Sequence, residues 1–168
     1  MVINVAMADL KIAETPDILQ TTLGSCIGIA IYEQSPPSPP FEKGGRGRVG
    51  GLAHIMLPIN NNGDPNKAKY ADSAISELLR KLTSKGVDKC ELIAKIAGGA
   101  KMFDTNKKIS HFMEIGLRNE EAVREGLKRE GVRLIAADTG SNYGRNIQFE
   151  IATGRITVKS HGREAIVI

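Results

Sequence analysis

Several residue types are scarce in this chain of 168 residues. It has no tryptophan, four phenylalanines and three tyrosines, so its core must be mainly aliphatic and few rings are available to stack on nucleic-acid bases. The formal charge is only +4, and the segment 41–51, with three cations and one acid, supplies half of it. A weak, dispersed positive charge is typical of a solvated surface. We therefore expect no nucleic-acid partner.

Long apolar runs and paired cysteines are also missing. No apolar segment approaches the roughly 20 residues that a bilayer-spanning helix needs, and residues 1–6 carry no basic leader of a secretory signal. The two cysteines, Cys26 and Cys90, form no C-x-x-C pair, and the three histidines have no clustered acids beside them. We therefore expect a cytoplasmic protein with reduced thiols, no membrane insertion, no metal and no cofactor.

The patterns that are present predict a mixed α+β fold, with helices packed on a largely β core. A helix is predicted where Ala71, Ala74, Ile75, Leu78, Leu79 and Leu82 form one apolar stripe, with Gly86 as its left-handed stop. A second helix is predicted from an N-cap at Asn119 to Gly131. Strands are predicted at residues 2–13, 18–23, 27–32, 49–57, 91–96, 132–137, 147–151 and 155–159, with an edge at 164–168. The first of these leaves room for a bend.

A segment rich in proline and glycine, at about residues 34–48, separates the predicted strand 27–32 from the predicted strand 49–57. Such a composition sustains neither a helix nor a central strand, so it predicts a loop inserted into a hairpin. The hairpin would bring the strand 27–32 beside the strand 49–57. The length of the chain fits a single domain that spans residues 1–168.

Cys26 is the leading candidate for a reactive group. It lies between the turn Gly24-Ser25 and an apolar strand, where a thiol can be fixed by its neighbours and still meet a substrate. His54 lies in the partner strand of the predicted hairpin. The plainer alternatives are a small buried apolar residue for Cys26 and a hydrogen-bonded core histidine for His54. Cys90 has no obvious partner and is interpreted as structural.

A cysteine beside a histidine would be a nucleophile. The imidazole can take the thiol proton to form an ion pair, which predicts a thiol that reacts well below its usual pKa of about 8.5. The backbone amides around Gly24 and Ser25 could hold a developing oxyanion. A third polar group, Thr21 or Thr22, would orient the imidazole.

Motifs along nearly the whole chain resemble the CheD family of chemoreceptor glutamine deamidases. They are Leu23-Gly24-Ser25-Cys26 before an apolar strand, residues 51–58, residues 69–72, residues 94–100, Ile115-Gly116 with Arg118-Asn119, and Asp138-Thr139-Gly140. The resemblance implies a β-sandwich-like core flanked by helices, as in deamidating toxins. It also implies a protein-glutamine glutaminase that hydrolyses selected receptor glutamines to glutamate and ammonia through a cysteine thioester.

The family's functional residues fall on particular positions of this sequence. Its cysteine nucleophile falls on Cys26, its histidine acid and base on His54, and its threonine on Thr21, with Thr22 as the alternative. The implied partners are the cytoplasmic domains of chemoreceptors and a CheC-type phosphatase. Two alternatives stay open: a non-catalytic regulatory partner of that phosphatase, and a cysteine hydrolase with other substrates.

The sequence departs from the family pattern in two places. One is the proline- and glycine-rich insertion, which a surface hairpin loop should absorb at modest entropic cost. The other is Ser141, which stands where the family more often has a second glycine after Gly140. A side chain there should strain a left-handed turn by about 1 kcal/mol.

Overall fold

The computed structural model describes residues 1–34, 47–101 and 114–168. Over these residues the strands are β1 (Val2–Asn4), β2 (Asp9–Glu14), β3 (Ile18–Leu23), β4 (Ile27–Glu33), β5 (Val49–Ile55), β6 (Leu92–Gly98), β7 (Arg133–Thr139), β8 (Arg145–Glu150), β9 (Arg155–Lys159) and β10 (Ile166–Val167). The helices are α1 (Ala71–Ser84) and α2 (Ile115–Glu130), with short 3-10 turns at Lys67–Lys69 and Lys89–Glu91.

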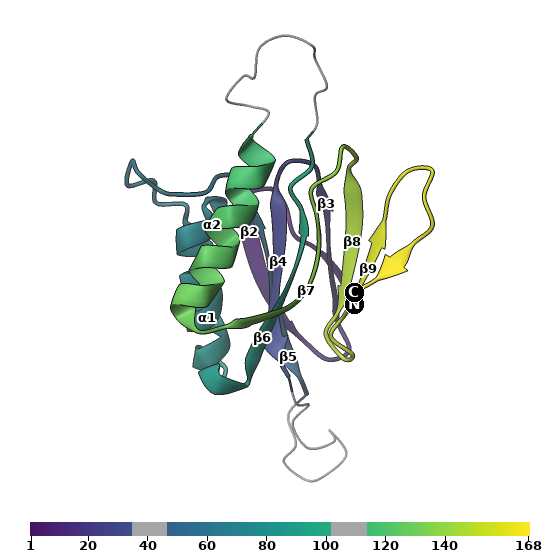
Figure 1. The fold of residues 1–168 in the computed structure, drawn as a ribbon. Coiled ribbons are helices and arrows are strands. Elements are labelled where there is room, and N and C mark those ends of the chain that lie inside the picture. The colour runs from purple at the N-terminus through teal and green to yellow at the C-terminus, as the bar shows by residue number, and fades with distance from the viewer. Residues whose placement is uncertain (35–46, 102–113) are drawn as a thin grey trace.

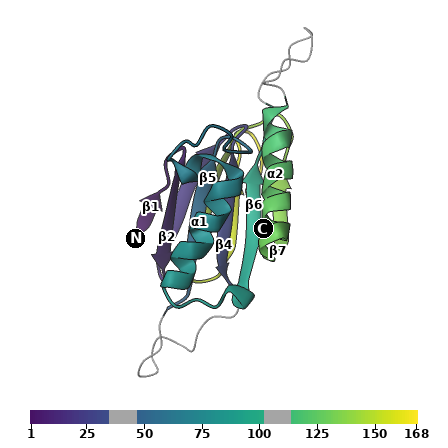
Figure 2. The same cartoon turned by 90° about the vertical axis from the view of Figure 1, so that its left-hand side faces the viewer.

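The described strands form two sheets that pack face to face. The central sheet has the order β2-β5-β4-β6-β7, and the outer sheet has the order β1-β3-β8-β9-β10. Figure 1 shows three layers, with the helices on one side, the central sheet in the middle and the outer sheet on the other side. Figure 2, viewed from the helix side, shows α1 and α2 lying across the central sheet. The predicted α+β fold with helices on a β-sandwich-like core is therefore confirmed.

The three inner strands of the central sheet, β5, β4 and β6, are buried on both faces, and the alternation of their side chains divides the core in two. Ile27, Ile29 and Ile31 of β4 face the helices. Ala30 and Tyr32 of the same strand face the outer sheet, where they meet β3 and β8 residues such as Phe149. Because the side-chain period of a strand is two, the parity of a residue number tells which layer its side chain enters.

The predicted hairpin is confirmed. β4 pairs antiparallel with β5, from Ile27 opposite Ile55 to Tyr32 opposite Gly50. Residues 35–46 of the predicted inserted loop lie outside the described residues. The predicted hairpin between residues 147–151 and 155–159 is also confirmed, as the pair β8 and β9.

The single strand predicted over residues 2–13 is wrong, because this segment contributes to both sheets. β1 pairs parallel with β3 of the outer sheet, whereas β2 pairs antiparallel with β5 of the central sheet. Val5 is buried between the sheets, and Ala8, at a φ of 56°, redirects the chain. The mostly apolar composition of residues 2–13 concealed this change of sheet.

The first predicted helix is confirmed, including Gly86 at a φ of 82° beyond its end. The second helix ends as predicted at Gly131, in the left-handed conformation with a φ of 71°. Its predicted start is wrong, because α2 begins at Ile115 and Asn119 lies inside it, fully buried. In the described part of the chain neither helix is long and apolar enough to cross a membrane.

Candidate active site

Cys26 and His54 lie on the same face of the central sheet. His54 is opposite Gly28 in the register of β4 and β5, and Cys26 precedes Gly28 by two residues, so both side chains enter the layer between the sheets. Cys26 packs against the apolar cluster of that layer, and His54 is only 3% exposed. A diagonal pair of this kind has Cα atoms roughly 7–8 Å apart. No hydrogen bond joins the two side chains in the described residues.

A chain of hydrogen bonds fixes the imidazole of His54. Nδ1 lies 2.8 Å from Oγ1 of Thr21, and the same hydroxyl donates to the carbonyl of Val5 at 2.8 Å. A hydroxyl has one proton, and a carbonyl can only accept. The Thr21 proton therefore goes to Val5, and Nδ1 of His54 must be the donor to Thr21. In the neutral ring this leaves the lone pair on Nε2.

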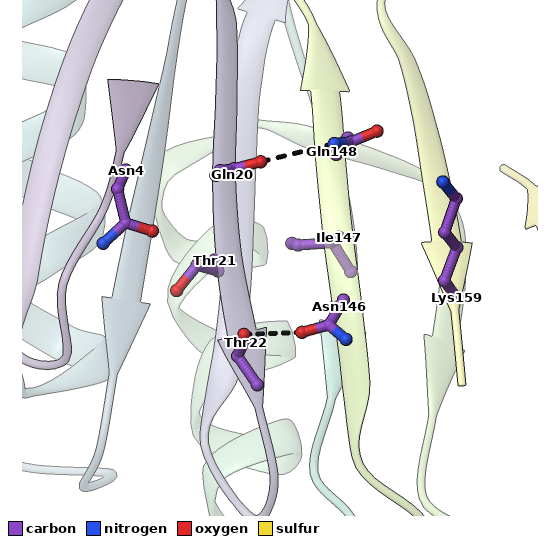
Figure 3. A pocket seen from close by; sticks show the side chains of 8 residues that line it. All are labelled: Asn4, Gln20, Thr21, Thr22, Asn146, Ile147, Gln148 and Lys159. Atoms are coloured by element: carbon purple, nitrogen blue, oxygen red, sulfur yellow. Dashed lines mark hydrogen bonds between the residues drawn. The ribbon is translucent and has the colours of Figure 1, made fainter. Parts of the chain in front are cut away.

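Thr22 lies on the opposite face of β3. Its hydroxyl donates to Oδ1 of Asn146 at 2.6 Å, as Figure 3 shows. This pair borders a polar hollow of about 140 Å³, which is lined by Asn4, Gln20, Thr21, Thr22, Asn146, Ile147, Gln148 and Lys159. Neither Cys26 nor His54 belongs to that lining. Of the two candidate threonines, Thr21 is the one that contacts His54.

Burial sets the ionisation of the thiol and the imidazole. It raises the pKa of Cys26 above its ordinary value of 9.0, and a hydrogen bond from the residue's own backbone opposes this only in part. It also lowers the pKa of His54 below 6.5. Both directions favour a neutral thiol beside a neutral imidazole. Burial therefore opposes the ion pair that the sequence predicts, and the reactivity of the thiol stays a prediction.

The loop that carries Cys26 is held by its carbonyl groups. The carbonyl of Gly24 accepts from the amide of Ala100 at 2.9 Å, and that of Cys26 accepts from Gly99 at 2.8 Å. The carbonyl of Ser25 accepts from the Asn119 side chain at 3.2 Å. By contrast, the amide N–H groups of residues 24–26 donate to no other residue within the described segments. Three successive donors are thus available to a ligand.

Glycines let the supporting segments approach this loop. A Cβ on Gly98, which has a φ of 114°, would lie 2.2 Å from the carbonyl oxygen of Cys26. A Cβ on Gly116 in the first turn of α2 would lie 2.5 Å from the carbonyl oxygen of Gly99. Both contacts are closer than any Cβ can tolerate, so positions 98 and 116 can be filled only by glycine.

Sequence reasoning missed two buried polar residues that support the site. One is Asn119, which was interpreted as a helix cap. The other is Arg145, whose side chain is fully buried and whose Nε donates to Asp138 at 2.7 Å and Nη1 to the Gly140 carbonyl at 3.0 Å. These bonds shape the turn that follows β7, and the Gly140 amide in turn donates to the Gly98 carbonyl at 2.9 Å.

The predicted left-handed turn at Gly140 and Ser141 is present. Gly140 has a φ of 75° and Ser141 a φ of 61°, so a residue with a side chain does occupy a conformation that favours glycine. The Ser141 carbonyl accepts from the amide of Lys101 at 2.7 Å. The turn therefore lies against residues 98–101, which contact the Cys26 loop.

The described segments offer no obvious metal centre. Within residues 1–34, 47–101 and 114–168, no group of three His, Cys, Asp or Glu side chains is arranged to hold a metal ion.

Comparison with known proteins shows one matching family and several similar proteins. Residues 56–160 match the family described as CheD chemotactic sensory transduction. Proteins named "Probable chemoreceptor glutamine deamidase CheD" are similar over almost the whole chain. That of Caldanaerobacter subterraneus subsp. tengcongensis is 43% identical, over 96% of this chain and 94% of its own. That of Desulfitobacterium hafniense is 43% identical over 98% of both chains, and that of Methanococcus vannielii is 37% identical over 95% of both.

Proposed function

The chain belongs to the CheD family, and from this membership and the geometry of the site we propose that it is a chemoreceptor glutamine deamidase. In this proposal Cys26 is the nucleophile, His54 is the general acid and base, and Thr21 orients His54. The product is a glutamate side chain on the receptor, with release of ammonia.

The observation that carries the proposal is the hydrogen-bond chain from His54 through Thr21 to Val5. It supports a ring with its proton on Nδ1 and a lone pair on Nε2, which is the form that can accept a proton from a nucleophile. His54 enters the same layer as Cys26, so Nε2 serves a thiol that lies two residues along the neighbouring strand.

The first half of the reaction forms a thioester. As Sγ of Cys26 attacks the carboxamide carbon, its proton passes to Nε2 of His54, which begins neutral because burial lowers its pKa. The carbonyl oxygen gains negative charge and accepts hydrogen bonds from the N–H groups of Ser25 and Cys26, which donate to no other residue in the described segments. Collapse of this intermediate breaks the carbon–nitrogen bond, and His54 protonates the leaving ammonia.

The second half of the reaction regenerates the thiol. Water enters in place of ammonia, and Nε2 of His54 takes one of its protons as the oxygen attacks the thioester carbon. The carbon–sulfur bond then breaks, and His54 returns the proton to Sγ of Cys26. The receptor leaves with glutamate in place of glutamine. The proton balance closes without any group beyond these two side chains and one water.

The test uses the full-length protein and a cytoplasmic fragment of a chemoreceptor. Ammonia release and the mass change from carboxamide to carboxyl are measured for the wild type, Cys26→Ala and the matched control Cys90→Ala, which removes the exposed second thiol. We expect Cys26→Ala to lose at least about 1,000-fold in kcat/KM and Cys90→Ala to keep the wild-type rate. Activity in Cys26→Ala would assign the nucleophile elsewhere, and cleavage of the fragment would point to a protease.

Two finer parts of the proposal come from the family resemblance. One is a CheC-type phosphatase as a second partner, which co-purification with and without a receptor fragment would test. The other is a cytoplasmic location, which the two free cysteines support. Binding of the phosphatase by a wild-type protein that releases no ammonia would favour the purely regulatory alternative.

A further inference from the structure

Asn119 joins three elements of the site from inside a helix. It lies in the second turn of α2 and is 0% exposed. Its Nδ2 donates to the carbonyl of Ser25 at 3.2 Å and to that of Met56 at 2.9 Å. Ser25 precedes the nucleophile, and Met56 follows β5 two residues after His54. One amide group therefore links the nucleophile loop to the end of the histidine strand.

The two donors of this amide are used, and its oxygen is not. Oδ1 of Asn119 is buried and has no hydrogen-bond partner in the described residues. Exchanging the oxygen and nitrogen would direct Oδ1 at two carbonyl oxygens, which is unfavourable, so the contacts fix the orientation. A buried acceptor without a partner is costly and therefore rare. The buried position of Asn119 is therefore explained by the two hydrogen bonds that its Nδ2 donates and not by its oxygen.

Holding the Ser25 carbonyl also sets the direction of the Cys26 N–H. The peptide bond between Ser25 and Cys26 is trans, so its C=O and N–H groups point in opposite directions. A carbonyl held toward α2 by Asn119 turns the Cys26 N–H away from the helix. That N–H donates to no other residue in the described segments and is one of the two proposed oxyanion donors.

We propose that Asn119 is a positioning residue, which aims the Cys26 N–H at the oxyanion and keeps the nucleophile loop in register with the histidine strand. This inference rests on the proposed deamidase function for its catalytic meaning. The orientation of the loop is independent of that function and can be measured without a substrate. The amide of Ala100 orients the Ser25 N–H in the same way. It donates to the Gly24 carbonyl at 2.9 Å, and that carbonyl shares a peptide bond with the Ser25 N–H.

The side chains that could replace Asn119 differ in a way that the test can use. Ala removes both donors and leaves two carbonyl groups without this partner. Asp keeps the shape, but its carboxylate would face two carbonyl oxygens and repel them. Val123, one helical turn further along α2, is also 0% exposed and belongs to the core between the helices and the central sheet. Val123→Ala is therefore a matched control that weakens the packing of the same helix and removes no side-chain hydrogen bond to the loop.

The first measurement is steady-state deamidation by folded protein. We expect Asn119→Ala to lower kcat about 100-fold with KM changed less than about threefold, because a misdirected oxyanion donor acts in the transition state. Asn119→Asp should be at least as slow, and Val123→Ala should stay within about threefold of the wild type. Alkylation of Cys26 by iodoacetamide, which forms no oxyanion, should change less than about threefold in Asn119→Ala.

The second measurement needs no activity. Relaxation of the backbone ¹⁵N nuclei should give Cys26 an order parameter near 0.85 in the wild type and Val123→Ala, and below about 0.6 in Asn119→Ala. A rigid Cys26 amide in Asn119→Ala would overturn the inference even if the wild type deamidates nothing. Equal kcat for Asn119→Ala and Val123→Ala would overturn it in an active enzyme. A wild type without deamidation but with the expected loss of order would refute the proposed function alone.

Discussion

The layer between the two sheets has polar groups at both ends, and the two ends use them differently. At the site end, the side chains of Thr21 and His54 bond to each other, and the ring nitrogen Nε2 makes no hydrogen bond in the described residues. At the far end, Lys95 donates to the backbone carbonyls of Gly154 at 2.7 Å and Ile168 at 2.9 Å. At the site end the lone pair of Nε2 stays available, whereas at the far end the ammonium of Lys95 binds backbone carbonyls.

The charges at the two ends differ in the same way. Burial, together with Arg155 and Arg48, lowers the pKa of Lys95, yet its ammonium has two carbonyl acceptors. It lies 5.7 Å from the centre of the Tyr32 ring, and the Arg48 guanidinium lies 5.8 Å from the same centre. At the site end, by contrast, the hydrogen bond joins Thr21 to a neutral imidazole of His54.

This contrast separates a structural polar cluster from a reactive one. The far-end donors attach the β8–β9 turn and the last residue to the central sheet, so their removal should affect stability. The site-end bonds determine a tautomer, so their removal should affect rate. Burial alone does not distinguish the two ends, since His54 is 3% exposed and Lys95 is 8% exposed.

The strongest challenge to this contrast is the replacement Thr21→Val, which keeps the shape of the side chain and removes its hydroxyl. His54 would lose the acceptor that keeps its proton on Nδ1, and the Val5 carbonyl would lose its donor. We expect kcat/KM for receptor deamidation to fall about 10- to 100-fold. Thr21→Ser should restore most of the rate because it restores the hydroxyl.

The neighbouring residue supplies the matched control. Thr22→Val makes the same chemical change on the opposite face of β3, where, among the described residues, the hydroxyl bonds to Asn146 alone. Its rate should stay within about threefold of the wild type, since a hydrogen bond at an exposed site contributes little. Equal losses in Thr21→Val and Thr22→Val would mean that strand β3 matters as a whole, and that the tautomer of His54 does not.

The far end is tested by Lys95→Met, which keeps the length of the side chain and removes its donors. The Gly154 carbonyl would lose its bond to the ammonium, while the carbonyl of Ile168 keeps the amide of Ile156 at 3.0 Å. We expect the free energy of unfolding to fall by about 1–3 kcal/mol, as measured by urea denaturation. The kcat of the folded fraction should be unchanged, and a kcat loss beyond threefold would show that the two ends are coupled.

Most of this arrangement could be predicted from the sequence, because it follows from local patterns. The hairpin that brings His54 beside the Cys26 strand is present as two apolar runs around a segment of glycine and proline. The layer that each side chain enters follows from the parity of its number once the register is known. The residues themselves left Thr21 and Thr22 both open, and only the family resemblance favoured Thr21. The choice depends on which face of β3 meets the central sheet, and that face is set by packing across the sandwich.

Asn119 illustrates a different kind of failure. A polar residue before two glutamates is typical of a helix start, and this local signal favoured a cap. However, Gly116, Val123 and Leu127 lie on the same helical stripe as Asn119, three or four residues apart, and all are buried. A polar residue on the buried stripe of a helix is the signal that indicates a structural or positioning role. The ionisation of Cys26 also could not be predicted, because it depends on how deeply the sandwich buries the thiol.

The smallest expected effect concerns pH. Because burial lowers the pKa of His54 in the folded state below 6.5, the unfolded chain binds a proton there that the folded chain does not, so stability should fall as the pH drops below about 6.5. Because burial raises the pKa of Cys26 above 9.0, the folded chain keeps a proton that the unfolded chain loses, so stability should also fall as the pH rises past about 9.

Single substitutions isolate these two contributions from those of all other groups. Each proton can supply a slope of at most about 1.4 kcal/mol per pH unit. Urea denaturation of the wild type, His54→Gln and Cys26→Ser should show that His54→Gln flattens the acid limb alone and that Cys26→Ser flattens the alkaline limb alone. An ion pair in the folded state would reverse both signs, because the folded chain would then hold the imidazole proton and release the thiol proton. If His54→Gln steepened the acid limb and Cys26→Ser steepened the alkaline limb, the folded state would contain a thiolate and an imidazolium, and the neutral pair would be wrong.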